Sequence, residues 1–308
     1  MRRDIDRLIA AVAAPQYGAF ARHQVRDVDR KALQRRVASG GIIQLTQNVF
    51  CLAGAPRSDE QRIVAATLDV PGGAVASYFS AAWLWRFPGF SLKGVEVTAR
   101  RQQHRQFDLA RVHHPRLLLP DHITRWRGID VTSVALTIYN LAGVVHPSRL
   151  ARLVANVCSR SPQIHDQLHD LLSVLAASGR NGIVPMRAVL ERWPRGAALP
   201  GSGQEVRFED LLASAGITGL RRQVDLGGHT WIGRVDYLCD RTGVIFEVDS
   251  ELNHTSPEDV AADEVRDAAL IAAGHPEVVR IWTEVLWSRP GEAVSTVRRT
   301  RMKHRRAA

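Results

Sequence analysis

The stretch WIGRVDYLCDRTGVIFEVD, residues 231–249, contains two segments of alternating polarity separated by a turn. Residues 231–238 and 244–249 alternate polar with apolar side chains, which is typical of half-buried strands. Residues 240–243 have the composition of a turn. The stretch therefore predicts a β-hairpin, and the register of that hairpin decides which side chains meet.

A two-residue loop at 241–242 would place Asp236 directly opposite Glu247. Directly paired Cβ atoms lie about 4.5–5.5 Å apart, so one cation can bridge the two carboxylates. A three-residue loop with a bulge at Gly243 would instead put Glu247 on the other face of the sheet. We favour the two-residue loop, because it separates the polar side chains from the apolar ones. The polar face would then carry Arg234, Asp236, Glu247 and Asp249, and the apolar face Val235, Tyr237, Phe246 and Val248.

These residue types point to metal-dependent phosphodiester chemistry. Two adjacent carboxylates repel each other, and a divalent cation removes that repulsion. The oxygen ligands Asp236 and Glu247 favour Mg²⁺ or Mn²⁺ over Zn²⁺, and such an ion polarises a phosphoryl oxygen and activates a water. His254, just after the second strand, is placed to transfer a proton near neutral pH.

Helices are expected on both sides of the hairpin. Ser202 can cap a helix that extends to Leu212, and Glu205 then has capping-box spacing. After the hairpin, residues 258–273 have helical periodicity, and residues 278–282 predict a further strand. Arg266 lies three residues after Asp263, so it either holds a phosphate or pairs with that aspartate.

The first 54 residues predict a small helical domain with a hairpin. Apolar residues at helical spacing indicate a helix over 4–14, a short helix follows near 20–25, and Asp29 caps a third helix that ends at Gly40-Gly41. Residues 42–45 and 49–52 predict two strands. This order is that of a winged helix-turn-helix, whose recognition helix at 29–39 would enter the major groove of DNA. The candidate DNA contacts are Arg30, Lys31, Gln34, Arg35 and Arg36. The alternative is a solvated basic face on a small interaction domain.

The net charge of +10 is unevenly distributed along the 308 residues. Residues 1–54 carry +5 and residues 55–200 carry +8, whereas residues 201–297 carry −9 and the segment 298–306 carries +6. A basic body joined to an acidic module suits a protein that holds a polyanion and presents carboxylates to it. The alternative is that the asymmetry only sets solubility.

Composition limits the compartment and the cofactors. Three widely separated cysteines form no Cys-x-x-Cys pair, which argues against a disulfide framework and against structural zinc. No apolar run approaches the roughly 20 residues of a membrane span, and the start lacks the apolar core of a signal peptide. We expect a cytoplasmic protein without a membrane partner.

Polar and apolar residues between 202 and 287 form an ordered pattern. They are Glu205 ahead of Leu211-Leu212, then Gln223, Val235-Asp236, Glu247-Val248-Asp249, His254, Asp263-x-x-Arg266, Leu270, Gly274 and Val279-Arg280. With this order the segment resembles the domain of unknown function related to very-short-patch-repair endonucleases, within the PD-(D/E)XK superfamily. The resemblance implies a metal site at Asp236 and Glu247, Glu205 as an outer ligand and His254 as acid or base. Asp249 and Arg266 complete the candidate catalytic set, although the superfamily has lysine where this chain has Asp249.

The remainder resembles a second family. Residues 5–54 are similar to the winged helix of abortive-infection (AbiEi-like) antitoxins, and Ser77-x-x-Ser80-Ala81-Ala82-x-Leu84 is similar to the segment that follows it in relatives. Residues 55–195 are interpreted as an α-rich middle domain with some strands and without a chemical motif, and residues 194–203 as a linker. Within the middle domain we expect a strand at 95–98 and helices at 80–84, 136–141, 147–158, 163–177 and 184–193.

The predicted protein is an α+β multidomain chain. It has a winged helix-turn-helix at 1–54, an α-rich middle at 55–195, an α/β restriction-endonuclease-like domain at 196–297 and a basic tail at 298–308. The expected function is Mg²⁺- or Mn²⁺-dependent DNA cleavage or nicking. The alternative is a non-catalytic antitoxin-type repressor with a degenerate nuclease domain, whose partners would be DNA and a cognate toxin protein.

Overall fold

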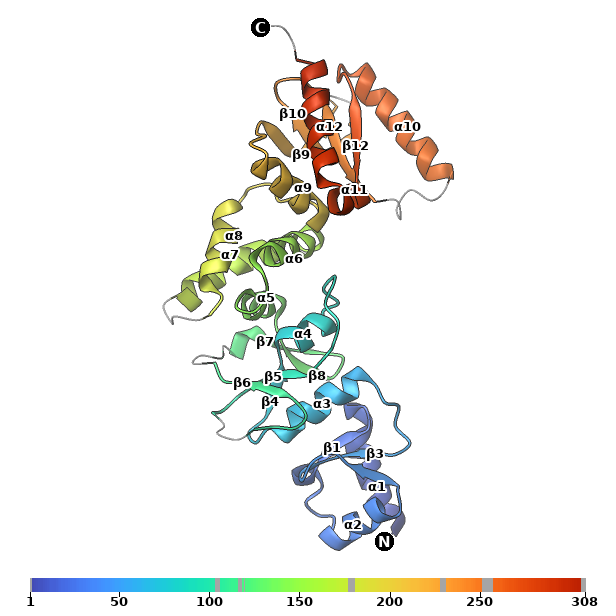
Figure 1. Ribbon diagram of the computed structural model, residues 1–308. Helices are drawn as coiled ribbons and strands as arrows, with labels where there is room; N and C mark the ends of the chain where they lie inside the picture. Colours follow the sequence, from blue (N-terminus) through green and yellow to red (C-terminus); the bar gives the residue numbers. More distant parts are fainter. Residues whose placement is uncertain are drawn as a thin grey trace. The chain divides into compact units, whose positions relative to one another are not determined.

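The chain divides into two compact units (Figure 1). The computed structural model describes residues 2–102, 106–115, 118, 120–176, 181–227, 231–250 and 257–305. One unit comprises Met1–Val145 and Gln167–Arg187, and the other His146–Asp166 and Ala188–Ala308. Both contain helices and strands, so the predicted α+β class is confirmed, and the predicted middle segment 55–195 is shared between the two units.

The N-terminal part of the first unit begins with α1 (Arg2–Ala13), the helix predicted over 4–14. A 3₁₀ helix, η1 (Ala14–Gln16), contains Pro15 and ends it. The short helix predicted near 20–25 is instead strand β1 (Ala19–Ala21) followed by a 3₁₀ helix, η2 (Arg22–Val25). All three residues of β1 are buried, and pairing with a later strand supplies the hydrogen bonds of their backbone. Because this pairing depends on a segment distant in sequence, a local helical pattern could not reveal it.

The third predicted helix and the hairpin are both present. Helix α2 (Arg30–Ala38) starts at Asp29, whose carboxylate accepts a hydrogen bond from the backbone N–H of Ala32 at 3.1 Å. Strands β2 (Ile42–Gln44) and β3 (Val49–Leu52) pair antiparallel, and β1 adds to β3, so the sheet order is β1-β3-β2.

A five-stranded sheet follows, where the sequence predicted a mainly helical segment. Its order is β6-β5-β4-β8-β7. The strands are β4 (Ala74–Ala76), β5 (Glu96–Ala99), β6 (Arg111–His113), β7 (Ile123–Trp126) and β8 (Ile129–Thr132). Only the strand near 95–98 was predicted, because strands of three or four residues are too short to establish a period of two.

Two helices predicted beside this sheet are present, and two elements that were not predicted accompany them. Those near 80–84 and 136–141 are α4 (Tyr78–Leu84) and α5 (Val134–Ala142). Residues 120–122 form the 3₁₀ helix η3 (Pro120–His122), and α3 (Asp59–Asp69) packs on the sheet. The three predicted helical segments that follow are α6 (Pro147–Arg160), α7 (Gln163–Ala176) and α8 (Ile183–Arg192).

The C-terminal sheet has helices on both faces (Figure 1). The strands are β9 (Leu220–Leu226), β10 (Gly233–Cys239), β11 (Ile245–Asp249) and β12 (Val278–Trp282), in the order β12-β11-β10-β9. The helices are α9 (Gly203–Ser214), α10 (Pro257–Ala272), α11 (Thr283–Ser288) and α12 (Pro290–Lys303). Helices α9, α11 and α12 pack on Tyr237 and Phe246, whereas α10 packs through Leu270 on Val235 and Ile245.

The predicted hairpin register is confirmed, but the predicted loop length is wrong. Tyr237 pairs with Phe246, which places Asp236 opposite Glu247. The turn has four residues, 240–243, because the last bond joins the N–H of Cys239 to the carbonyl of Val244 at 2.8 Å. The N–H of Gly243 donates to the carbonyl of Cys239, and its φ of +74° favours glycine.

The basic segment predicted as a tail begins inside a helix. Residues 298–303 belong to α12, whose Val297 and Thr300 are buried in the C-terminal unit. The prediction considered only the charge of these arginines. It therefore missed the buried positions Val297 and Thr300, which lie on one face of the helix.

Candidate functional site

Asp236 and Glu247 lie at the point where two neighbouring strands stop pairing through their backbones. The β10–β11 pairing includes Tyr237 with Phe246 but does not continue to the next pair. Instead, the N–H of Asp236 donates to Oε2 of Glu247 at 3.1 Å, and the N–H of Val248 donates to Oδ2 of Asp236 at 2.9 Å. Each carboxylate thus binds the backbone of the opposite strand, which holds the two side chains close together.

The expected alternation along β10 breaks at Asp236. Val235 packs in the cluster that contains Leu270 of α10, whereas Tyr237 packs against Phe208 of α9 on the other face of the sheet. The prediction that Val235 and Tyr237 share one face is therefore wrong. The break leaves Asp236 between the two helical layers rather than on one polar face.

Gln223 on β9 connects Asp236 to a third carboxylate. Its Nε2 donates to Oε2 of Glu205 at 2.7 Å and to Oδ1 of Asp236 at 3.2 Å. The backbone of Gln223 has φ +50°, a left-handed conformation that costs a non-glycine residue roughly 1–2 kcal/mol. This cost, within a strand beside buried carboxylates, indicates that the position of the Gln223 amide is imposed by the site.

Glu205 enters the site from the first turn of α9 and is 4% exposed. Ser202 caps α9 as predicted, because its hydroxyl accepts the N–H of Glu205. The Glu205 carboxylate, however, accepts the N–H of Gly201 at 2.8 Å and the amide of Gln223. A Cβ atom at Gly201 would lie 2.9 Å from Oε1 of Glu205, so glycine permits this close approach.

Arg266 of α10 binds the other side of the pair. Its Nη2 donates to Oε1 of Glu247 at 2.9 Å and to the carbonyl of Arg234 at 2.7 Å. The acidic partner of Arg266 here is thus Glu247 rather than the predicted Asp263, while its role as a phosphate ligand stays a prediction. The i, i+3 rule considers neighbours on one helix, whereas α10 lies against a strand that supplies a better acceptor.

Asp249 lies beside a second arginine. Its Oδ2 is 3.1 Å from Nε of Arg280 on β12, and Arg280 also binds Asp267 and lies 3.6 Å from Asp263. One guanidinium therefore gathers three carboxylates next to the cluster. On β12, Arg280 is the residue paired in register with Glu247 of β11.

The cluster is electrostatically strained. Burial, together with repulsion from Asp236, raises the pKa of Glu205 to about 7 and the pKa of Glu247 to about 8. Burial also raises the pKa of Asp236, against hydrogen bonds from Val248 and Gln223 that lower it. Neighbouring carboxylates with raised pKa values are characteristic of functional sites.

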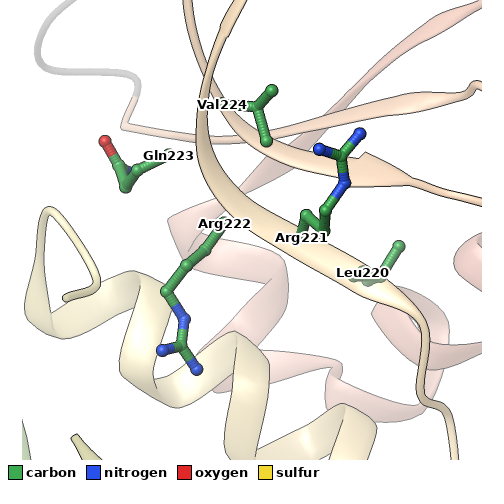
Figure 2. A pocket seen from close by; sticks show the side chains of 5 residues that line it. All are labelled: Leu220, Arg221, Arg222, Gln223 and Val224. Atoms are coloured by element: carbon green, nitrogen blue, oxygen red, sulfur yellow. The ribbon is translucent and has the colours of Figure 1, made fainter. Parts of the chain in front are cut away.

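An open pocket of about 470 Å³ runs along the edge strand β9 (Figure 2). Arg222 points towards α9, where its Nε donates to Glu209 at 2.8 Å, and Arg221 points to the opposite side of the strand. Gln223 lines this pocket and also binds the buried carboxylates. It therefore joins the cluster to the surface.

The donor set fits a hydrated magnesium or manganese ion. Over the described ranges, no three histidine, cysteine or acidic side chains are gathered closely enough to hold a metal ion by themselves. Mg²⁺ commonly binds through one or two carboxylates and keeps several waters, and Asp236 and Glu247 supply two. His254, the predicted acid or base, lies outside the described residues.

The candidate DNA contacts on α2 differ in their surroundings. Arg30, Lys31, Gln34 and Arg35 are exposed. Arg36 forms an ion pair with Asp6 of α1 and its side chain is 15% exposed. Arg30 and Gln34 line a cavity of about 240 Å³ together with the β2–β3 residues Gln44, Gln47 and Asn48. Arg36 therefore braces α1 against α2, and the other four face solvent.

Two site residues were not among the sequence-based candidates. Gln223 and Arg280 both belong to the ordered pattern of polar positions, but residue type alone gave them no role. An amide that donates to two carboxylates, and an arginine that gathers three, are recognisable only when the strands are placed side by side.

Comparison with known proteins adds no assignment. No protein-family model matches the chain, and no curated protein matches it. Among the described helices, none combines the length and the apolar character that crossing a membrane requires.

Proposed function

We propose that this protein is a DNA-binding, metal-dependent endonuclease or nicking enzyme. The observation that carries the proposal is the buried pair Asp236 and Glu247, held side by side by reciprocal bonds to the opposite strand. Unpaired, these carboxylates are costly, and a hard divalent cation would relieve that cost. The ordered resemblance to repair-type endonucleases over 202–287 supports the same reading.

The chain's own residues would prepare the site for a phosphodiester. Asp236 and Glu247 would hold Mg²⁺ or Mn²⁺, which when bound polarises a phosphoryl oxygen and activates water. Gln223 fixes the orientation of Asp236, and Arg266 fixes that of Glu247. Glu205 would act through Gln223 as an outer carboxylate, and His254 would transfer the proton.

The N-terminal part would hold the DNA. Its helices and three-stranded sheet support a winged helix-turn-helix reading, in which α2 is the recognition helix. Arg30, Lys31 and Arg35 would bind phosphates, and Gln34 would offer its amide to a base edge.

A supercoiled plasmid incubated with Mg²⁺ or Mn²⁺ tests the catalytic proposal. Asp236→Asn and Glu247→Gln should each reduce nicking at least about 1000-fold, equivalent to about 4 kcal/mol of transition-state stabilisation. Asp225→Asn, an exposed carboxylate-to-amide change on β9, should leave nicking unchanged. Wild-type protein that never nicks with either metal would end the proposal.

One observation favours a second candidate, a non-catalytic repressor of the antitoxin type. Asp249 stands where the superfamily has its lysine, and the nearby cation Arg280 is already bound by carboxylates. A repressor would retain a gel shift on duplex DNA, lose it on Arg30→Ala/Lys31→Ala/Arg35→Ala, and leave plasmid intact. The nuclease would show the same gel-shift pattern together with metal-dependent nicking.

A further inference from the structure

Four arginines line one cavity of about 300 Å³ at the turn end of the β10–β11 hairpin. We call this group the arginine cradle; it consists of Arg241 from the turn and Arg298, Arg301 and Arg305 from α12 and the residues just after it. Ile217, Thr242 and Met302 complete the lining. Among the lining residues that the structure describes, none is acidic.

The cradle is built into the helix rather than being a mobile tail. Helix α12 buries Ala293, Val297 and Thr300, which lie four and three residues apart. Within α12, Arg298 and Arg301 lie next to this buried stripe at i, i+3 spacing, so the stripe fixes the direction in which their guanidinium groups project.

The nearby carboxylates are already engaged elsewhere. Asp240 pairs with Arg221, and Glu277 pairs with Lys303 and His304. Arg298 donates to the carbonyl of Ala215 at 2.9 Å. In the part of the chain that the structure describes, none of the four cradle arginines has an ion pair with an acidic side chain.

We propose that the arginine cradle binds backbone phosphates of nucleic acid, as a second contact on the C-terminal unit. Guanidinium groups match phosphate oxygens in a two-point geometry, and several unpaired ones around a cavity favour an anion with more than one charge. Three of the four cradle arginines come from beyond residue 297, whereas residues 201–297 carry a net charge of −9, which would repel a polyanion from the rest of this unit.

The cradle is separate from the carboxylate cluster. Helix α9 contributes Glu205 to the cluster at its first turn, and its C-terminal cap Ala215 accepts the bond from Arg298 of the cradle. Ten residues at 1.5 Å per residue place the two about 15 Å apart. The inference rests on the proposed function for the identity of the polyanion, and on this geometry for the site.

Salt-dependent binding of a labelled duplex to the full-length chain tests the cradle. Each phosphate contact contributes about 0.9 to the slope of log K against log salt concentration. Arg301→Gln/Arg305→Gln should therefore lower the slope by about 2 and weaken binding roughly ten-fold near physiological salt. Arg298 is left intact in this variant, because its bond to Ala215 supports the fold.

Arg289→Gln/Arg299→Gln is the charge-matched control, since both residues lie at α12 outside the cradle lining. Equal losses in the two double variants, or an unchanged slope in the cradle variant, would refute the cradle. Stabilisation of wild-type protein by millimolar inorganic phosphate alone, equal to that by the duplex, would also refute it and indicate a small-anion site. If wild-type protein binds no duplex at all, the proposed function fails first, and bound duplex without nicking leaves the cradle intact.

Discussion

The basic face of α2 and the carboxylate cluster handle charge in opposite ways. On α2, Arg30, Lys31 and Arg35 are exposed, so water screens them at little cost. In the cluster, Glu205 and Glu247 are 4% and 6% exposed, and hydrogen bonds are needed to keep them there. The comparison teaches that a buried like-charge site is costly to maintain, whereas an exposed basic face costs almost nothing. Substitutions should therefore affect stability in the cluster and binding on α2.

The largest expected effect on stability comes from Arg266→Met. The change removes the cation beside Glu247 and the bond to the Arg234 carbonyl, which should lower the free energy of unfolding by about 3 kcal/mol. Calorimetry of the full-length chain measures it. Arg234→Gln, an exposed change on strand β10, should alter stability by less than about 0.5 kcal/mol. Equal effects would mean that Glu247 does not depend on Arg266.

A pH series probes the cluster next. The folded pKa values of Glu205 and Glu247, about 7 and about 8, lie above the ordinary glutamate value. Between pH 5 and 8 the folded state holds protons that the unfolded state has released, so metal-free stability should fall as pH rises, by several kcal/mol for the two groups together. Glu247→Gln should flatten this dependence and raise stability at pH 8. A profile that rises through this range in the wild type would contradict the raised pKa values.

The basic face should respond in the opposite manner. Arg30→Ala/Lys31→Ala/Arg35→Ala should leave thermal stability nearly unchanged but reduce the salt slope of duplex binding by about 2 to 3. Arg26→Ala/Arg57→Ala/Lys93→Ala removes the same charge from exposed positions of the same unit outside α2. If this control weakens binding equally, net charge rather than α2 is responsible.

Arg36→Ala gives the smallest effect and separates the two kinds of basic residue on α2. Because Arg36 is paired with Asp6, its loss should cost up to about 1 kcal/mol of stability and leave the salt slope unchanged. Arg35→Ala in parallel should do the reverse. A salt slope that falls by about 0.9 in Arg36→Ala would show that Arg36 binds phosphate despite its internal pair.

The sequence predicted the pairing of Asp236 with Glu247 correctly, although the polarity argument for it holds only in part, because Val235 and Tyr237 lie on opposite faces of the sheet. Asp236 faces Glu247 when the turn is centred between residues 241 and 242, and the structure has a turn with this centre. The predicted loop length was wrong, because a two-residue turn at 241–242 and a four-residue turn at 240–243 have the same centre. Both turns therefore pair the same residues of the two strands. Turn composition does not distinguish them.

The contacts around the pair could not be predicted from local rules. Gln223, which donates to Asp236, itself has a left-handed backbone conformation within strand β9. No strand propensity favours that conformation. Arg266 binds Glu247 across the sheet, and its helix neighbour Asp263 faces Arg280 instead. Each of these pairs depends on where elements distant in sequence come to lie.

The length of α9 has a consequence for the size of the ligand. A nucleic acid strand advances about 3.4 Å per nucleotide, so the roughly 15 Å between the two ends of this helix corresponds to four or five nucleotides. A shorter fragment can occupy one end only, and a longer one can engage both. Under the proposed function, the length of α9 would therefore set a minimum fragment length for tight binding, whatever the base sequence.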